Sequence, residues 1–97
     1  MHISIRRYKT KSGAELTRRV QAGFLPLIRQ AEGFIAYYVV ESGGDAWTSI
    51  SVFETAAQAE ASNTFAREWA GANVLALSGV PDVTAGPVMA HAAKTAG

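Results

Sequence analysis

The sequence predicts an α+β fold, in which four strands form an antiparallel sheet and two helices cover one of its faces. Three observations lead to this prediction. Apolar-rich segments on both sides of a Ser-Gly-Gly-Asp turn at residues 42–45 are typical of a β-hairpin. Amphipathic helical patterns precede and follow that hairpin. Short strand patterns open and close the chain, so a strand–helix–strand unit occurs twice within 97 residues.

The first strand is expected at residues 2–8, where Ile3 and Ile5 alternate with other residue types. One face of this strand is therefore apolar and the other is mixed. The first helix is expected to begin at Ser12, because Ser12 and Glu15 have the spacing of a capping box. Apolar residues then recur at helical spacing, as in an amphipathic helix.

Pro26 lies inside the first helix, where a proline removes one intrahelical hydrogen bond. We therefore expect a kink near residues 22–23. Gly33 follows the last periodic residues and is expected to end the helix in a left-handed conformation. The two strands of the hairpin are then expected at residues 34–41 and 46–54.

The second helix shows similar start and stop signals. Thr55 and Gln58 have the spacing of a capping box, and Gly79 and Pro81 close the far end. A last strand fits within residues 82–91, where a Gly-Pro pair implies a bulge or an edge position. The side chains expected on the inner side of this helix are Ala59, Ser62, Ala66, Trp69, Ala70, Asn73 and Leu77.

This βαββαβ order is that of the ferredoxin-like sandwich, with a four-stranded antiparallel sheet. Its second strand is unusual, because residues 34–40 are apolar or aromatic on both sides. An antiparallel strand with one solvated side normally alternates between apolar and polar residues. We therefore expect a partner to cover the second sheet face, and a homodimer joined through that face is the simplest cover.

Composition narrows the classes of function. Hydrophobic residues make up 48% of the chain and charged residues 18%, which indicates a folded domain that hides part of its surface in a partner. The net charge of +1 disfavours a nucleic-acid partner and an acidic membrane surface. The chain has no cysteine, which excludes disulfides, thiolate metal sites and cysteine nucleophiles. Its longest apolar run is too short for a membrane span, so a cytoplasmic protein is expected.

Four segments also carry a family resemblance. They are Gly33-Phe34, Tyr37-Tyr38, the Ser51-Val52-Phe53-Glu54 strand end and the helix from Ala61-Ser62-Asn63 to Trp69. With the order of elements, they resemble the dimeric α/β-barrel superfamily, and within it the antibiotic-biosynthesis-monooxygenase-like (ABM) domains. The resemblance covers residues 1–91 as one domain and leaves residues 92–97 as a flexible tail. Such domains include cofactor-free monooxygenases, haem-degrading enzymes, lactone isomerases and domains with no assigned activity.

The resemblance implies how a monooxygenase of this type works without a metal or other cofactor. Its electron-rich phenolic or quinol substrate is deprotonated and passes an electron to oxygen itself. The protein then supplies an enclosed apolar pocket, a few hydrogen-bonding groups and a path for one proton. The pocket candidates are Trp69 and Asn73 on the second helix, Asn63 at its rim, Tyr37 or Tyr38, Trp47 and His91.

Plain packing is the competing interpretation of these side chains. Trp69 is then a core residue, and Asn63 and Asn73 are helix-surface or packing residues. Strand alternation sends one of Tyr37 and Tyr38 to the helix side and the other to the dimer side. Only one of the two tyrosines is therefore a pocket residue, and the pattern does not decide which.

Metal and haem are not expected. His2 and His91 lie on strands expected to be neighbours, but two imidazoles without a carboxylate or thiolate make a poor metal site. Haem-degrading members carry an Asn on the first strand and a His near the end of the second helix, whereas residues 1–8 lack Asn and residues 74–81 lack His. Two functions stay open. One is a dimer that binds a hydrophobic or aromatic metabolite and oxidises it without a cofactor, and the other is a non-catalytic dimeric ligand-binding or assembly module.

Overall fold

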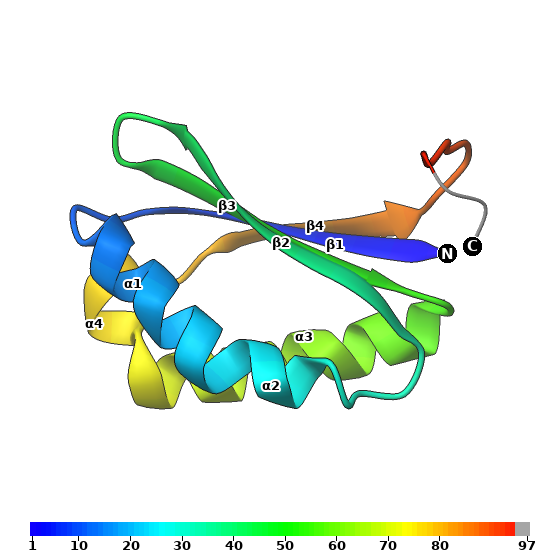
Figure 1. Cartoon of the computed structure of the whole chain (residues 1–97), viewed down its shortest axis with the longest axis horizontal. Helices are drawn as coiled ribbons and strands as arrows, with labels where there is room; N and C mark the ends of the chain where they lie inside the picture. Colours follow the sequence, from blue (N-terminus) through cyan, green and yellow to red (C-terminus); the bar gives the residue numbers. More distant parts are fainter. Residues whose placement is uncertain (95–97) are drawn as a thin grey trace.

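The computed structural model describes residues 1–94. Four strands form one antiparallel sheet in the order β2-β3-β1-β4, and the helices lie on one side of it (Figure 1). This arrangement confirms the predicted ferredoxin-like α+β sandwich and places β4 at an edge of the sheet. The strands are β1 (His2–Lys9), β2 (Phe34–Gly43), β3 (Ala46–Phe53) and β4 (Asp82–Pro87), and the helices are α1 (Gly13–Arg19), η1 (Val20–Phe24), α2 (Leu25–Ile28), α3 (Ala56–Asn73) and α4 (Leu75–Ser78).

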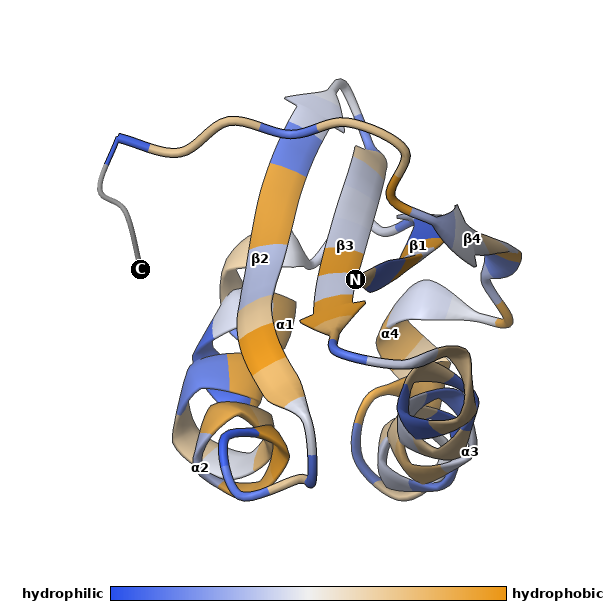
Figure 2. Ribbon diagram, turned by 90° about the vertical axis from the view of Figure 1, so that its right-hand side faces the viewer, coloured by the Kyte–Doolittle hydropathy of each residue, from blue (hydrophilic) through white to orange (hydrophobic). Residues whose placement is uncertain are grey.

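The helices form two runs side by side beneath the sheet, one from α1 to α2 and one from α3 to α4 in the opposite direction (Figure 1 and Figure 2). The core lies between these runs and the sheet. It includes Phe24, from the first run, which is only 2% exposed. The other buried residues of this cluster are Leu16, Val20, Ile28, Phe53, Ala59, Ala66 and Val74.

The first helical run bends where the sequence predicts a kink. A π-helical turn, Val20–Phe24, separates α1 from α2, and Pro26 stands in the first turn of α2. Proline has no N–H, so the carbonyl of Ala22 loses its usual partner four residues later, and the widened turn accommodates that loss. Gly33 adopts a φ of 76°, which confirms the predicted left-handed conformation. The prediction that Gly33 ends the helix is wrong, because α2 ends at Ile28 and Gly33 lies in the turn that leads into β2.

Only one of the two predicted capping boxes forms. The side chain of Thr55 accepts from the backbone N–H of Gln58, and the Gln58 side chain accepts from the backbone N–H of Thr55. The box predicted at Ser12 is wrong, because no side chain caps the start of α1. Ser12 has φ −114° and ψ 42°, outside the extended conformation of a usual N-cap. Glu15 instead binds Arg18 and Arg19 on its own helix.

The second helical run is interrupted at Val74, which has φ −134° and ψ 0°. The predicted inner side of this run is wrong at its end, because Asn73 is exposed. Asn73 occupies the last turn of α3, where its side-chain amide donates to the carbonyl oxygen of Trp69 at 2.8 Å. The amide therefore satisfies a helix-end carbonyl and does not pack beneath the sheet.

The helices cover the more polar side of β1. Ser4 and Arg6 are 0% and 7% exposed and contact α3 through Asn63. Alternation then places Ile3 and Ile5 on the side of the sheet that bears no helix. The apolar face predicted for the first strand is therefore the face left open by the helices.

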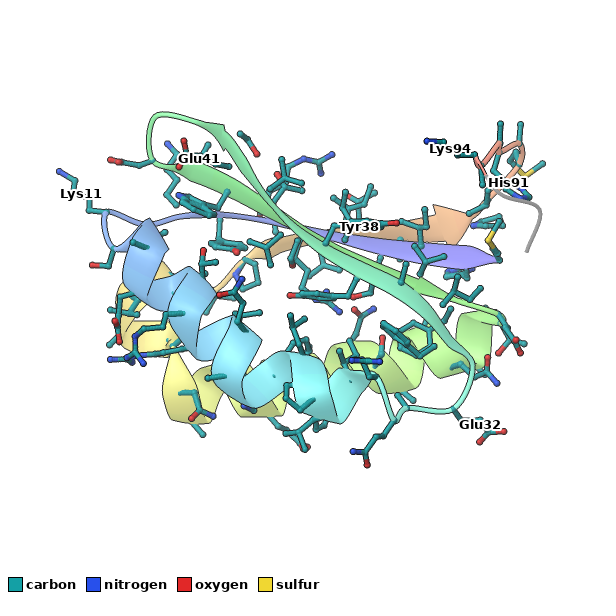
Figure 3. All side chains as sticks on the ribbon, in the orientation of Figure 1. Lys11, Glu32, Tyr38, Glu41, His91 and Lys94 are labelled. Atoms are coloured by element: carbon teal, nitrogen blue, oxygen red, sulfur yellow. The ribbon has the colours of Figure 1, made fainter. Side chains whose placement is uncertain are left out.

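The helix-free side of the sheet, called the open face below, is largely apolar. Its side chains come from β1, β2 and β3, and Tyr38 and Val40 of β2 are 55% and 43% exposed. Figure 3 shows Tyr38 on this side of the sheet, away from the helices. The apolar residues that define the open face are Ile3, Ile5, Tyr38, Val40, Ile50 and Val52.

The chain beyond β4 continues without regular structure. Val88 still donates its backbone N–H to the carbonyl of Met1 at 3.0 Å, and the chain then runs on exposed to Lys94. The last three residues of the predicted flexible tail, 95–97, lie outside the described part of the chain. Between residues 1 and 94, no helix has the length and apolar character needed to cross a lipid bilayer.

Candidate functional site

A cavity of about 540 Å³ lies between the two helical runs and the sheet, and it is called the inner cavity below. The sheet and the helices both contribute polar groups, and the helices contribute most of its apolar wall. The rim is apolar and exposed, since Leu75, Val80 and Val83 are 46%, 87% and 53% exposed. The polar and aromatic lining residues are Arg6, Tyr8, Phe24, Tyr37, Ser49, Asn63, Arg67, Trp69 and Ser78.

Aromatic rings shape the deep wall of the inner cavity. The ring centroid of Phe24 lies 5.2 Å from that of Tyr37, in an edge-to-face arrangement, and 5.1 Å from that of Trp69. A stacked contact with Phe65, at 5.6 Å, completes the cluster. Gly23 allows the close approach of Trp69, because a Cβ atom at Gly23 would lie 3.2 Å from the indole ring. The π-helical turn therefore leaves room for the indole of Trp69 at Gly23.

Trp69 has a double role in this cluster. One part of its indole packs against the buried ring of Phe24, and the residue as a whole is only partly buried. The same side chain lines the inner cavity. Trp69 therefore both packs against the core and lines the cavity.

Arg6 is the unexpected polar group of the site. Its guanidinium donates to the hydroxyl of Ser51 at 2.9 Å and to the side-chain oxygen of Asn63. The amide of Asn63 donates in turn to the hydroxyl of Ser4 at 3.0 Å. This network joins β1, β3 and α3 across the layer between helix and sheet. Within this network, the side chains that accept hydrogen bonds from Arg6 are all neutral.

Two tyrosines stand near this guanidinium. The pKa of Tyr8 is raised to about 12, chiefly by burial and also by the nearby Tyr37, while the charge of Arg6 opposes the rise. Burial also raises the pKa of Tyr37, and the Ser49 hydroxyl and the charge of Arg6 oppose that rise. Both phenols therefore stay protonated at neutral pH and are available as hydrogen-bond donors.

The lining of the inner cavity contains no Asp, Glu or His among the residues that the structure describes. Its ionisable side chains are two arginines and two tyrosines. Burial lowers the pKa of Arg6, but an arginine keeps its charge in proteins. The site thus offers hydrogen-bond donors and positive charge, and it has no side chain suited to act as a general base near neutral pH.

Three of the sequence-predicted pocket residues meet at the inner cavity. They are Tyr37 on β2 and Asn63 and Trp69 on α3. Asn63 and Trp69 both line it although six residues separate them, because the cavity extends along the helix. Tyr37 is thus the member of the tyrosine pair that faces the helices, and Tyr38 lies on the open face.

The other candidates lie elsewhere. Trp47 packs over the start of α1, where its ring occupies the space that a Cβ at Gly13 would need. Asn73 is at the exposed end of α3. His91 is exposed in the segment after β4 (Figure 3).

Sequence reasoning missed Arg6 and Tyr8. The signal was present in β1, where Ser4, Arg6 and Tyr8 share one side of the strand. When one side of a strand is apolar and the other is mixed, the apolar side is normally expected to face the helices. Here the helices cover the mixed side, so its polar residues line the cavity.

Comparisons with known proteins identify the fold. No protein-family model matches the sequence, and no curated protein matches it. Among solved structures, a monooxygenase from the gene ActVA-Orf6 of Streptomyces coelicolor, in complex with nanaomycin D, matches with a TM-score of 0.73 and 16% identity over 97% of this chain and 92% of that one. SnoaB, a cofactor-independent oxygenase from Streptomyces nogalater, matches with a TM-score of 0.70 and 14% identity over 93% and 94%. The chain has the ABM-like fold.

The same fold also occurs in a haem-degrading protein. MhuD of Mycobacterium tuberculosis, with two haems in its active site, matches with a TM-score of 0.72 and 16% identity over 96% of this chain and 100% of that one. A haem whose iron is held by histidine does not fit the inner cavity here, since neither His2 nor His91 lines it. Within residues 1–94, no group of three or more His, Asp or Glu side chains is placed to hold a metal ion.

Proposed function

We propose that the inner cavity binds a hydrophobic, aromatic small molecule. The observation that carries this proposal is the cavity itself, with a volume of about 540 Å³ and a wall that includes the rings of Tyr37 and Trp69. Pockets of about 300–1,000 Å³ with mainly apolar walls and a few polar groups are usual for small ligands. Aromatic walls favour a planar ring system, because rings stack or meet edge to face.

The reaction that we propose is oxidation of this ligand by dioxygen without a cofactor. An electron-rich phenol or quinol that has lost a proton transfers an electron to oxygen, and the resulting pair combines. Where the reacting carbon is a CH₂ between aromatic rings, one molecule of O₂ converts it to a carbonyl and releases water. The protein needs only to exclude water, orient the rings and stabilise the anion. The neutral phenols of Tyr8 and Tyr37 and the charge of Arg6 suit the last task.

A non-catalytic binding module is the second candidate, and one specific observation favours it. The lining residues include no carboxylate and no imidazole to accept the proton of a ligand. A catalytic site of this kind therefore depends on a ligand acidic enough to lose its proton to water. A ligand without that acidity would bind and leave unchanged.

We also propose that two copies assemble through the open face. This face is apolar across three strands, and Tyr38 and Val40 are exposed there in one copy. Its charged side chains, among them Arg7 and Asp82, lie toward the end of β1 and the edge strand β4. A two-fold axis places the same patch on both partners, so a second copy covers the apolar area completely. Burial of that apolar area supplies the driving force for association of the two copies.

Oxygen uptake tests the proposed reaction. The purified protein, with no metal or cofactor added, is mixed with a panel of anthrones and naphthoquinols, and oxygen consumption is followed beside ligand binding. We expect consumption with at least one compound that binds. Trp69→Phe should weaken binding while its phenyl ring keeps part of the contact with Phe24, whereas Trp47→Phe, outside the cavity, serves as the control for binding. Binding without consumption across the panel selects the non-catalytic module, and the absence of binding refutes both.

Sedimentation tests the proposed assembly. We expect a dimer at micromolar concentration for the natural chain and a monomer for Tyr38→Lys, because a lysine places a charge in the apolar contact. Tyr37→Phe is the matched control, since the adjacent side chain faces the inner cavity. A monomeric natural chain, or a Tyr38→Lys variant that stays dimeric, contradicts the proposed interface.

A further inference from the structure

Arg6 is buried without a balancing negative charge. The residue is 7% exposed, and its two side-chain partners, Ser51 and Asn63, are neutral. The salt bridges found within residues 1–94 involve Arg18 and Arg19 with Glu15, so no carboxylate there pairs with Arg6. A buried charge is normally paired, because removal from water is unfavourable unless an opposite charge compensates.

The guanidinium keeps unused hydrogen-bonding capacity. An arginine has five N–H donors in a planar fork, and Ser51 and Asn63 accept from two of them. The remaining three are enough for a bidentate bond to a carboxylate. Arg6 itself is a lining residue, so a ligand in the inner cavity meets its side chain directly.

The rest of the lining fits an anion equally well. Its other charged side chain is also cationic, Arg67, and the nearby phenols of Tyr8 and Tyr37 are neutral donors. No acidic side chain of the lining competes for Arg6 or repels an anion. The network through Asn63 and Ser4 holds the guanidinium in place before any ligand arrives.

We infer that the inner cavity takes aromatic ligands that carry a carboxylate, and that Arg6 binds this carboxylate while the rings lie along Trp69 and Tyr37. The inference rests on the proposed binding function and narrows it to aromatic acids. It completes the charge balance of the site, since the ligand supplies the counter-ion that the chain lacks. Arg6 is a binding residue in this role.

A pair of probes that differ only in charge tests the inference. Anthracene-2-carboxylate and anthracene-2-carboxamide have nearly the same size and shape. Binding is measured by quenching of Trp69 emission in a Trp47→Phe background, where Trp69 is the sole tryptophan. We expect the carboxylate to bind about 10- to 100-fold more tightly than the amide, the factor typical of a hydrogen-bonded charge.

Substitutions then assign the preference to one side chain. Arg6→Met should remove the difference between the probes and leave amide binding within about twofold, and Arg6→Lys should retain part of it, because an ammonium keeps the charge but not the fork. Arg7→Met is the matched control, since Arg7 neighbours Arg6 in sequence but is exposed on the opposite side of β1.

Equal binding of the two probes to the natural chain overturns the inference while the proposed function stands. If neither probe quenches Trp69 emission, both the inference and the proposed binding function fail. The comparison of probes on the natural chain remains decisive even where Arg6→Met does not fold.

Discussion

Replacing Gly33 by alanine should destabilise the fold through two separate effects at the junction of α2 and β2. Gly33 has a φ of 76°, a left-handed conformation that disfavours any residue with a Cβ atom. A Cβ at this position would also lie only 1.8 Å from the side-chain oxygen of Gln58. That oxygen accepts the backbone N–H of Thr55 at 3.1 Å, in the capping box of α3. The alanine therefore strains the backbone and displaces a helix cap.

The magnitude follows from these two effects. A left-handed alanine is unfavourable by about 1–2 kcal/mol. Gln58 moves aside easily because its side chain is flexible, but its lost cap bond adds about 1 kcal/mol. The sum is about 2–3 kcal/mol, which lowers the melting temperature of a domain this size by about 10–20 °C. Thermal and urea unfolding measure it directly.

A double-mutant cycle with Gln58→Ala separates the two effects. Gln58→Ala alone should remove the cap bond, about 1 kcal/mol. In that background, Gly33→Ala has no cap left to displace, so only the backbone strain remains. The two changes should therefore be non-additive by about 1 kcal/mol. Additivity within about 0.5 kcal/mol would show that the alanine does not displace Gln58, and would refute the reasoning.

Two further predictions concern the core and the surface. Phe24→Ala removes a ring that is 2% exposed and contacts three other aromatic rings, so we expect a loss of about 3–5 kcal/mol in urea unfolding, and a loss below about 1 kcal/mol would contradict this packing. Hydrogen bonds from Arg18 and then Arg19 lower the pKa of Glu15 from 4.5 to about 2. Because its folded pKa is depressed, its contribution to stability is complete above about pH 4.5 and is lost as the pH falls through about 2. An NMR titration that gives Glu15 its usual pKa would rule out this ion cluster in solution.

Features that depend on neighbouring residues could be predicted from the sequence. The bend before Pro26, the left-handed Gly33 and the cap at Thr55 are all set by backbone rules that act within a few residues. The order of elements followed from the same local patterns, and with it a four-stranded sheet with the helices on one side. The cap at Ser12 does not form, since Ser12 lacks the extended conformation of an N-cap and Glu15 pairs with two arginines on its own helix.

The candidate site depended on contacts between distant parts of the chain. Arg6 bonds to Ser51 and Asn63, which are 45 and 57 residues away in sequence. Strand alternation sorts side chains into two faces, but it does not say which face the helices will cover. Local pattern therefore could not choose between Tyr37 and Tyr38, nor foresee that the polar side of β1 would turn inward.

The sequence by itself thus determined the strands and main helices, their order and a second strand that is apolar on both sides, because each depends on the spacing of residues close together in the chain. The tertiary structure alone decided that a charged arginine, two neutral tyrosines and a tryptophan surround one cavity. The physical reason is packing. The helices cover the polar side of β1, and hydrogen bonds to residues distant in sequence hold Arg6 there. The aliphatic side of the sheet is left without a helix.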